Sequence, residues 1–432
     1  MKKASVIIVG AGGRGTIYSN HLKTLSDRAE VVAVAEPRDF FRERIAHTHN
    51  IPPENQFHDW HDLLKRPKFA DAVIIATQDR MHLEPAIAFA ELKYDILIEK
   101  PLAPTLEECR TLIASAEANN IIMSVCHVLR YTNFTRTLKK LIDSGRIGQV
   151  MSVQHLEPVG YWRFAHSYVR GNWSREEDSS SVLLAKSIHD LDWLRYIVGA
   201  APKQVSSFGS LMFFRKENRP EGAADRCLDC KLEPECPYSA PRFYLERIRS
   251  GNIGAYVESV AGDATEESVL HQLRIGPYGR CVFACDNDVA DHQVVNIEFE
   301  NNATAVFTLA GCSKYGDRRT TVFGSLGELY GDGDTLRCCS YLTGKTEEIP
   351  IPPPEVPDHH GGGDYNLVRS FVDAVLTRNT SEIVTGPEIS LETHYLVFAA
   401  EIARKSGAVV NMKDFFHRTG VEGLLHHTRQ NS

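Results

Sequence analysis

The sequence lacks the features that mark several specialised classes of protein. No apolar run approaches the length needed to span a membrane, so we expect no transmembrane helix. No basic cluster is present and the formal net charge is -8, which argues against nucleic acid as a partner. We find no internal repeat and no low-complexity tail. With 43% hydrophobic and 24% charged residues among 432, the composition is typical of a soluble enzyme with two domains.

A secretion signal is also missing. Lys2 and Lys3 precede an apolar stretch, but this stretch is short, has no small-residue cleavage site and is needed as the first strand of the fold. We therefore expect a cytoplasmic protein. In that compartment the ten cysteines are better explained as thiols or metal ligands than as disulfides.

A strand-like run at 5–9 leads into a glycine-rich turn at 10–15, with the sequence G-A-G-G-R-G. In a dinucleotide-binding fold, Gly10 permits the tight turn, Gly12 lets the backbone approach a pyrophosphate and Gly15 allows close helix packing. The pattern alone is a weak signal, but its place between a strand and a helix predicts a bound dinucleotide. The alternative is a Rossmann-like turn that has lost its ligand.

The choice between NAD and NADP depends on two residues after the next apolar run. Glu36 stands where an acidic side chain accepts hydrogen bonds from the adenosine ribose and repels a 2′-phosphate, whereas Arg38 would attract that phosphate. We expect NAD rather than NADP. Gly13 and Arg14 of the turn are further candidate cofactor contacts.

Lys100 closes another strand-like run, 95–101, in which Ile96, Leu97 and Ile98 have the pattern of a buried parallel strand. Open α/β sheets bind ligands at the carboxyl ends of such strands. We therefore expect Lys100 and the dinucleotide in one crevice. An ion pair between Lys100 and Glu99 is the alternative, which the alternation of side chains along a strand disfavours.

The chain divides into two predicted domains and is expected to be α/β. Alternating strand and helix signals over 1–128 predict a Rossmann domain with a doubly wound parallel sheet. The segment 129–432 predicts an α/β domain with a large, mostly antiparallel sheet and two terminal helices at about 364–377 and 389–405. Its clearest strand signals lie at 291–300, 303–310, 319–324 and 335–342.

Several motifs, in this order along the chain, resemble the Gfo/Idh/MocA family, named for glucose-fructose oxidoreductase and inositol dehydrogenase. They are the glycine-rich turn, Glu36, Ala76-Thr77 with His82, Glu99-Lys100-Pro101, Arg130-Tyr131 and Ile188-His189-Asp190-Leu191-Asp192. The resemblance covers nearly the whole chain. It implies NAD(P)-dependent oxidation or reduction of a sugar, sugar derivative or cyclitol, with Ala76, Thr77, His82 and Glu99 at the cofactor. We also expect a homo-oligomer, a dimer or a tetramer.

Hydride transfer to or from an alcohol requires a group that takes or returns the hydroxyl proton. We expect His189 to be this acid/base, because histidine changes charge near physiological pH. Lys100 is expected to hold the substrate hydroxyl and assist the transfer. The alternative for His189 is a purely structural hydrogen bond to a neighbour.

The sequence departs from the family pattern next to His189. Dehydrogenases of the family commonly have an aspartate four residues before this histidine, and here that position is Ala185, followed by Lys186. A helix over 181–198 would place Lys186, His189 and Asp190 on one face together with Trp193. Lys186 is therefore a third catalytic candidate; the alternative is a solvated or ion-paired lysine.

The substrate pocket has five candidate residues. Tyr161 and Trp162 lie in a long loop and offer stacking surface for a sugar ring, although loop aromatics more often serve packing. Arg130, Tyr131 and Asp190 are the polar candidates beside them.

An insertion at about 215–285 contains C-x-x-C followed by another cysteine and has no core-forming periodicity. Such a segment needs a cross-link or a bound metal ion to hold it folded. Cys227, Cys230 and Cys236, with Cys281 as the fourth ligand, could bind a structural zinc ion. Cys285 is the alternative fourth ligand, and free or redox thiols or an iron–sulfur cluster are the alternative states.

Three classes of function remain open. The first is a dehydrogenase acting on a secondary hydroxyl of a sugar, glycoside or cyclitol. The second is a glycosidase or lyase that oxidises its substrate transiently, eliminates a substituent and then reduces the product. The third is a sensor that binds the nucleotide without chemistry. Net NADH formation, turnover without external NAD, or binding without turnover would distinguish the three.

Overall fold

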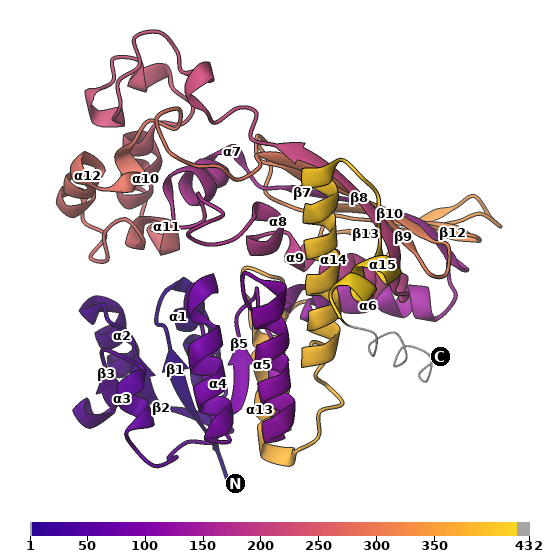
Figure 1. Ribbon diagram of the computed structural model, residues 1–432, viewed down its shortest axis with the longest axis horizontal. Helices are drawn as coiled ribbons and strands as arrows, with labels where there is room; N and C mark the ends of the chain where they lie inside the picture. Colours follow the sequence, from indigo (N-terminus) through magenta and orange to yellow (C-terminus); the bar gives the residue numbers. More distant parts are fainter. Residues whose placement is uncertain (1, 421–432) are drawn as a thin grey trace.

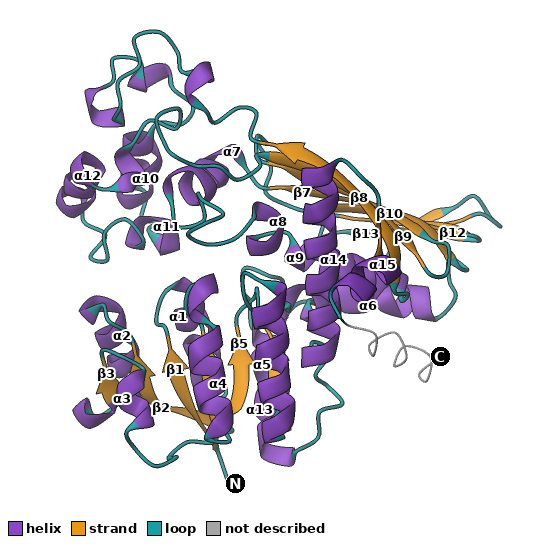
Figure 2. Ribbon diagram, viewed as in Figure 1, coloured by secondary structure: helices purple, strands orange, loops and turns teal. Residues whose placement is uncertain are grey.

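The computed structural model describes residues 2–420 and shows two α/β domains, one above the other in Figure 1. The lower domain contains the amino-terminal segment, and the upper one contains a broad sheet with helices on one side (Figure 2). No helix among the described residues is long and apolar enough to cross a membrane.

The first domain is built on a six-stranded, wholly parallel sheet with the order β3-β2-β1-β4-β5-β6. Its apolar strands are buried on both faces, which explains their near-continuous Val and Ile runs. The predicted doubly wound sheet is confirmed. Its elements are β1 Ala4–Val9, α1 Gly13–Thr24, β2 Ala29–Ala35, α2 Asp39–His49, β3 Gln56–Phe57, α3 His61–Leu64, β4 Ala72–Ile75, α4 Leu83–Glu91, β5 Asp95–Ile98, α5 Leu106–Asn119 and β6 Met123–Val125.

The second domain is built on a nine-stranded sheet with the order β14-β13-β12-β11-β7-β10-β9-β8-β15. Only the β7–β10 pair is parallel, so the predicted mostly antiparallel sheet is confirmed. The strands are β7 Val150–Pro158, β8 Pro202–Ser210, β9 His292–Phe299, β10 Thr304–Ala310, β11 Arg319–Gly324, β12 Gly327–Gly331, β13 Leu336–Ser340, β14 Thr346–Glu348 and β15 Val410–Asn411.

The helices of the carboxyl-terminal half serve both domains. α13 returns to the Rossmann domain, where Leu367, Val368 and Phe371 share an apolar core with β1 and α1. α14 packs against β8 and α9 in the second domain. Both terminal helices lie within two residues of the predicted bounds. The helices are α6 Asn133–Asp143, α7 Tyr161–Phe164, α8 Val182–Ala185, α9 Ile188–Val198, α13 Gly363–Thr377, α14 Pro387–Ser406 and α15 Met412–Arg418.

The predicted continuous helix over 181–198 is wrong. The chain leaves the helical path at Lys186 (φ -111°, ψ -58°) and Ser187 (φ -92°, ψ 5°), which separates α8 from α9. The break leaves the Ala185 carbonyl oxygen at the end of α8, where it accepts a hydrogen bond from another part of the chain. Lys186 and His189 therefore lie on different helical segments, and their shared face cannot be argued from helix periodicity.

The insertion forms a small helical unit with its own core. α10 (Ala240–Arg249), α11 (Gly254–Glu258) and α12 (Glu266–Ile275) enclose buried side chains that include Tyr244 and Val257. This unit lies above α1 and α2 of the Rossmann domain in the view of Figure 1. The insertion therefore has a compact fold, although its polar composition did not indicate a core.

Candidate active site at the domain junction

Lys100 follows β5, where the carboxyl end of the Rossmann sheet meets the second domain. Its side chain reaches across the junction, and Nζ donates a hydrogen bond to the Ala185 carbonyl oxygen at 2.5 Å. Glu99 accepts instead from Arg14 Nε at 2.7 Å and from the Tyr18 hydroxyl. The side chains of Glu99 and Lys100 thus have separate partners, as strand alternation predicts.

Burial lowers the pKa of Lys100 below its ordinary value, and the negative charges of Glu99 and Asp79 offset part of this effect. Asp79 is itself only 5% exposed and accepts hydrogen bonds from the hydroxyls of Ser179 and Ser180, each at 3.0 Å. Lys100 therefore gives up a proton more readily than a surface lysine does. This property suits a residue that takes part in proton transfer.

His189 is the second residue of α9 and lies edge-on to His127, with 6.1 Å between ring centroids. Burial lowers its pKa well below the ordinary value, and the positive charge of Lys100 lowers it further. The histidine is therefore neutral at physiological pH. His189 Nδ1 is buried without a hydrogen-bond partner among the described residues, so Nε2 is the ring nitrogen available to a substrate.

Lys186 belongs to a buried network of charged side chains. Its Nζ is hydrogen-bonded to Glu157, and Arg318 Nε lies 2.8 Å from the other oxygen of that carboxylate. Arg318 Nε also donates to Asp190 at 2.5 Å, and Asp190 accepts from His155 Nε2 at 3.0 Å. Burial lowers the pKa of Lys186 to about 7, although the Glu157 carboxylate opposes this shift. Lys186 can therefore exchange a proton near neutral pH.

The glycine-rich turn has the close contacts that its sequence predicts. Gly10 has φ +88°, and a Cβ atom there would lie 2.7 Å from the Ala76 carbonyl oxygen. A Cβ atom on Gly15 would lie 1.9 Å from the Gly10 carbonyl oxygen. Neither position accepts a side chain without displacing backbone. The turn thus brings β1, β4 and α1 together and leaves Gly12 and Gly13 available to a phosphate group at the start of α1.

Glu36 and Arg38 are paired rather than opposed. Glu36 Oε2 accepts from the Ala11 N–H at 2.8 Å, and Arg38 Nε donates to Oε1 at 2.6 Å. Arg38 donors keep the pKa of the Glu36 carboxyl below its ordinary value, although burial opposes this. Glu36 is buried and held in place, whereas the Arg38 side chain that pairs with it is about half exposed (55%). Glu36 is therefore the fixed group beside the turn.

Family models cover almost the entire chain. A model described as "Oxidoreductase family, NAD-binding Rossmann fold" matches residues 4–127, and one described as "Oxidoreductase family, C-terminal alpha/beta domain" matches residues 139–412. The chain belongs to the Gfo/Idh/MocA family. The resemblance seen in the motifs is thus confirmed, and the first domain of this family member is an NAD-binding Rossmann domain.

Related proteins include enzymes of more than one kind. The oxidoreductase YteT of Bacillus subtilis is 23% identical over 337 residues, which cover 74% of this chain and 76% of YteT. The 2,7-anhydro-N-acetylneuraminate hydratase of Mediterraneibacter gnavus is 29% identical over 48% of this chain, and the match spans about half of the hydratase (53%). Levoglucosan dehydrogenase in complex with NADH and levoglucosan has the same fold, with a TM-score of 0.71, 18% identity and coverage of 95% of this chain and all of that chain (100%).

Three further cofactor candidates of this family member are held by protein contacts. Arg14 bridges Glu99 and Asp364, at 2.7 Å and 2.5 Å. His82 is almost completely buried; its Nδ1 lies 2.7 Å from the Pro101 carbonyl oxygen and its Nε2 lies 3.2 Å from the Thr77 carbonyl oxygen. Ala76 contacts the turn at Gly10. These residues join the loops around the crevice, and their contact with a cofactor stays a prediction.

The five substrate candidates do not converge on one point. Arg130 forms a bidentate ion pair with Asp192, and both are buried. Tyr131 is fully buried, and its hydroxyl group forms a hydrogen bond of 3.1 Å with Thr385 Oγ1. Tyr161 and Trp162 pack against aromatic side chains of the insertion, and Asp190 belongs to the Lys186 network. The structure thus separates residues that the motifs suggested together; their substrate role stays a prediction.

Four further residues lie near the catalytic candidates: Asp79, Glu157, Arg163 and Arg318. Asp79 follows β4 at the carboxyl end of the sheet, a position that could have drawn attention to it. Glu157 near the end of β7 and Arg318 before β11 carry no comparable signal, because their pairing depends on strand order. Arg163 lies close enough to lower the pKa of both Lys100 and Lys186.

The four cysteines predicted to bind zinc are not arranged as a ligand set. No three of these cysteines, Cys227, Cys230, Cys236 and Cys281, have sulfur atoms within 4.8 Å of one another. Among the described residues, the one group of side chains that meets this criterion for a metal site is His21, Asp358 and Asp364. Cys227 Sγ accepts from Arg170 Nη2 at 3.4 Å, and Cys230 Sγ accepts from the Ala224 N–H at 3.5 Å. The zinc hypothesis is therefore not supported. Apolar packing around Tyr244 and its neighbours contributes to the order of the insertion.

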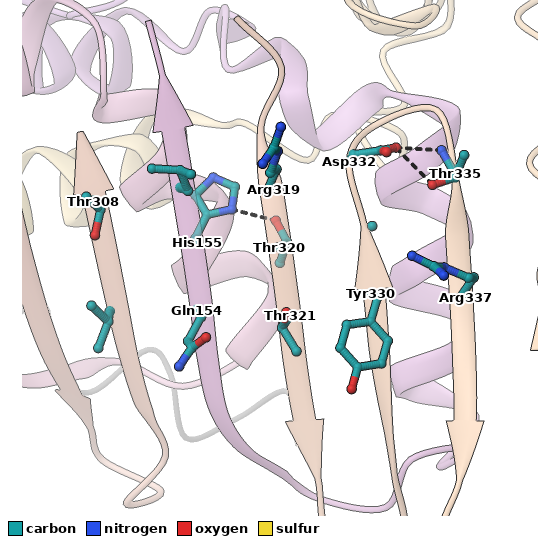
Figure 3. Close-up of a pocket in the computed structure, with 13 residues that line it drawn as sticks. Gln154, His155, Thr308, Arg319, Thr320, Thr321, Tyr330, Asp332, Thr335 and Arg337 are labelled. Atoms are coloured by element: carbon teal, nitrogen blue, oxygen red, sulfur yellow. Dashed lines mark hydrogen bonds between the residues drawn. The ribbon is translucent and has the colours of Figure 1, made fainter. Parts of the chain in front are cut away.

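A cavity of about 530 Å³ lies elsewhere, over the strands β7 and β10–β13 (Figure 3). Its lining includes polar side chains such as Gln154, Thr308, Tyr330 and Arg337, which the close-up shows on neighbouring strands. None of the three catalytic candidates lines it. One lining residue, His155, is hydrogen-bonded to Asp190 of the Lys186 network.

Replacement of Glu36 tests the cofactor assignment. Glu36→Ala should weaken NAD binding by about 10- to 100-fold, because a charged acceptor of hydrogen bonds from the ribose contributes roughly 1.5–3 kcal/mol. NADP should lose less, so the preference for NAD should fall. Titration of both nucleotides by fluorescence measures this ratio, with Glu43→Ala, an exposed change on α2, as the control. An unchanged ratio, or tighter binding of NADP by the unmodified protein, would contradict the assignment.

The low pKa of Lys186 predicts a pH dependence. Because this pKa is about 7, the side chain is charged below neutral pH and neutral above it, and kcat/KM for oxidation should rise across this range. Lys186→Arg keeps the charge at all pH values, so the ionisation near pH 7 should vanish from the profile. Lys140→Arg, an exposed substitution, should leave the profile unchanged. A profile that Lys186→Arg does not alter would show that Lys186 is only structural.

Proposed function

We propose that this protein is an NAD-dependent oxidoreductase that transfers a hydride between the nicotinamide and a secondary hydroxyl of a sugar, glycoside or cyclitol. One observation carries the proposal. Lys100, a buried lysine with a lowered pKa, lies at the carboxyl end of the Rossmann sheet and contacts the segment that leads into His189. Two proton-transfer groups thus meet beside the crevice that holds the dinucleotide.

The side chains have distinct tasks in the proposed reaction. Lys100 donates a hydrogen bond to the reacting hydroxyl and orients it, as it now does with the Ala185 carbonyl. His189 is neutral and accepts the hydroxyl proton through Nε2 during oxidation, or returns it during reduction. The bound NAD supplies the hydride acceptor. Lys186, whose pKa is about 7 and whose Nζ is hydrogen-bonded to Glu157, is a third group at the junction that can exchange a proton near neutral pH.

The relatives and the site support the proposed substrate class. Levoglucosan dehydrogenase, which shares the fold, has been solved with a sugar derivative and NADH. The junction in this protein carries several polar and charged groups, which suit a polyhydroxylated substrate. A net oxidation of a ring hydroxyl is the simplest reaction that uses both catalytic groups.

One observation favours a second candidate function. Lys186 has a pKa of about 7 and follows Ala185, the position where dehydrogenases of the family commonly have an aspartate. It provides a base in addition to His189 and Lys100. Elimination next to a transient ketone needs such a base, because the neighbouring C–H proton must be removed. A hydratase among the relatives supports this candidate. The cycle would oxidise the substrate, eliminate or add a group, and reduce it again with no net NADH.

A panel of sugars, glycosides and inositols separates the candidate functions. NADH absorbance that grows with substrate consumption supports the dehydrogenase. Substrate conversion without added NAD and without net NADH, followed by chromatography, supports the second candidate. Tight nucleotide binding with no conversion of any substrate would contradict both and indicate a sensor.

Variants of the two central residues test the catalytic assignment. Lys100→Ala and His189→Ala should each lower kcat by about two to four orders of magnitude, the usual range for a positioned acid or base, with little change in NAD affinity. Because the effects of replacing residues that act as a unit are not additive, kcat of the double variant should be little lower than that of the less active single variant. His61→Ala, an exposed histidine, is the control. Near-normal turnover by Lys100→Ala would refute the proposed mechanism.

A further inference from the structure

The insertion at 215–285 has no part in the proposed chemistry, yet one of its helices contacts the nucleotide-binding turn. A Cβ atom placed on Gly13 would lie 3.7 Å from the Cβ atom of Ala255 in α11. Both residues nevertheless remain exposed to solvent, so the surface between the turn and α11 is open rather than packed. The insertion therefore lies against the place where a dinucleotide pyrophosphate is expected.

An ion pair joins α11 to the Rossmann domain beside this contact. Arg44 Nη1 of α2 lies 2.9 Å from Glu258 Oε2 at the end of α11, and both side chains are about one-quarter exposed, 26% and 27%. Arg44 Nη2 also donates to Thr16 Oγ1 of α1 at 2.9 Å. Arg44 thus links α2, to which it belongs, with α1 after the glycine turn and with α11 of the insertion.

A second contact lies further along the same edge. A Cβ atom on Gly262 would lie 3.1 Å from the Phe40 ring, which is tight enough to restrict this position to a small residue. Phe40 begins α2, only four residues after Glu36, the residue expected at the adenosine ribose. The insertion therefore reaches both the phosphate end and the ribose end of the predicted dinucleotide site.

We infer that the insertion forms the second wall of the dinucleotide site, and that the Arg44–Glu258 pair holds it closed over bound NAD. The inference rests on the proposed function in one respect, that the crevice binds NAD. With the wall in place, the dinucleotide is released only when α11 separates from the turn. Its release is then slow.

Charge reversal tests this wall without using catalysis. NADH is bound to the purified protein, an excess of NAD is added, and the loss of NADH fluorescence gives the dissociation rate constant. Glu258→Arg places two arginines opposite each other and should speed release by about tenfold or more, because like charges in contact repel strongly. The double variant Arg44→Glu/Glu258→Arg restores an ion pair and should return the rate to within about threefold of the original, since the two sites are directly coupled.

A matched ion pair inside the insertion provides the control. Arg249 Nε lies 2.8 Å from Glu266 Oε1, and this pair joins α10 to α12 without a contact to the Rossmann domain. Glu266→Arg should therefore leave NADH release nearly unchanged. Thermal unfolding is measured for every variant, and if Glu258→Arg fails to fold, Glu258→Gln replaces it and should speed release to a smaller extent.

The outcomes separate this inference from the proposed function. Bound NADH whose release is unaffected by a folded Glu258 variant, or equally affected by Glu266→Arg, would refute the wall and leave the oxidoreductase proposal intact. No binding of either NAD or NADH by the unmodified protein would refute both. Faster release with Glu258→Arg and recovery in the double variant would establish the insertion as part of the cofactor site.

Discussion

The candidate site depends on one hydrogen bond between the two domains, from Lys100 Nζ to the Ala185 carbonyl oxygen. This acceptor lies at the end of α8, before the chain turns through Lys186 and Ser187 into α9. Lys100 follows β5 of the first domain, so the bond links the dinucleotide crevice to the region of α9, the helix that carries His189. A continuous helix would use that carbonyl internally and leave Lys100 without this partner.

Charge balance is the second constraint on the junction. Lys186 and Arg318 have carboxylate partners in Glu157 and Asp190, and so their burial is tolerated. Lys100 has a backbone carbonyl as its partner, and burial lowers its pKa. The junction therefore contains ion pairs together with two lysines, Lys100 and Lys186, that lose a proton more readily than a surface lysine does. The insertion adds to this by lying over the open side of the crevice, where exclusion of water would strengthen each electrostatic contact.

Short-range sequence signals predicted the Rossmann domain well. The glycines at 10 and 15 are required because backbone atoms leave no room for a side chain, and this requirement can be recognised from their spacing. The buried strand before Lys100 and the opposite directions of Glu99 and Lys100 follow from the two-residue period of a strand. The antiparallel sheet and the helices α13 and α14 were predicted for the same reason: their hydrophobic patterns are local.

Only the tertiary structure decided how distant segments meet. The sequence between 181 and 198 has a helical pattern throughout, yet packing at the junction breaks it at Lys186, where a buried ion pair with Glu157 of β7 outweighs helix propensity. Glu157 and Arg318 become neighbours because β7 pairs with β11, an order that no local pattern contains. The cysteine spacing suggested a metal, whereas the structure shows an apolar cluster in the insertion and no close set of cysteine sulfur atoms among the described residues. Sequence alone thus determined the cofactor fold and Lys100, whose signals are local, while the partners of Lys186 and His189 depended on long-range packing.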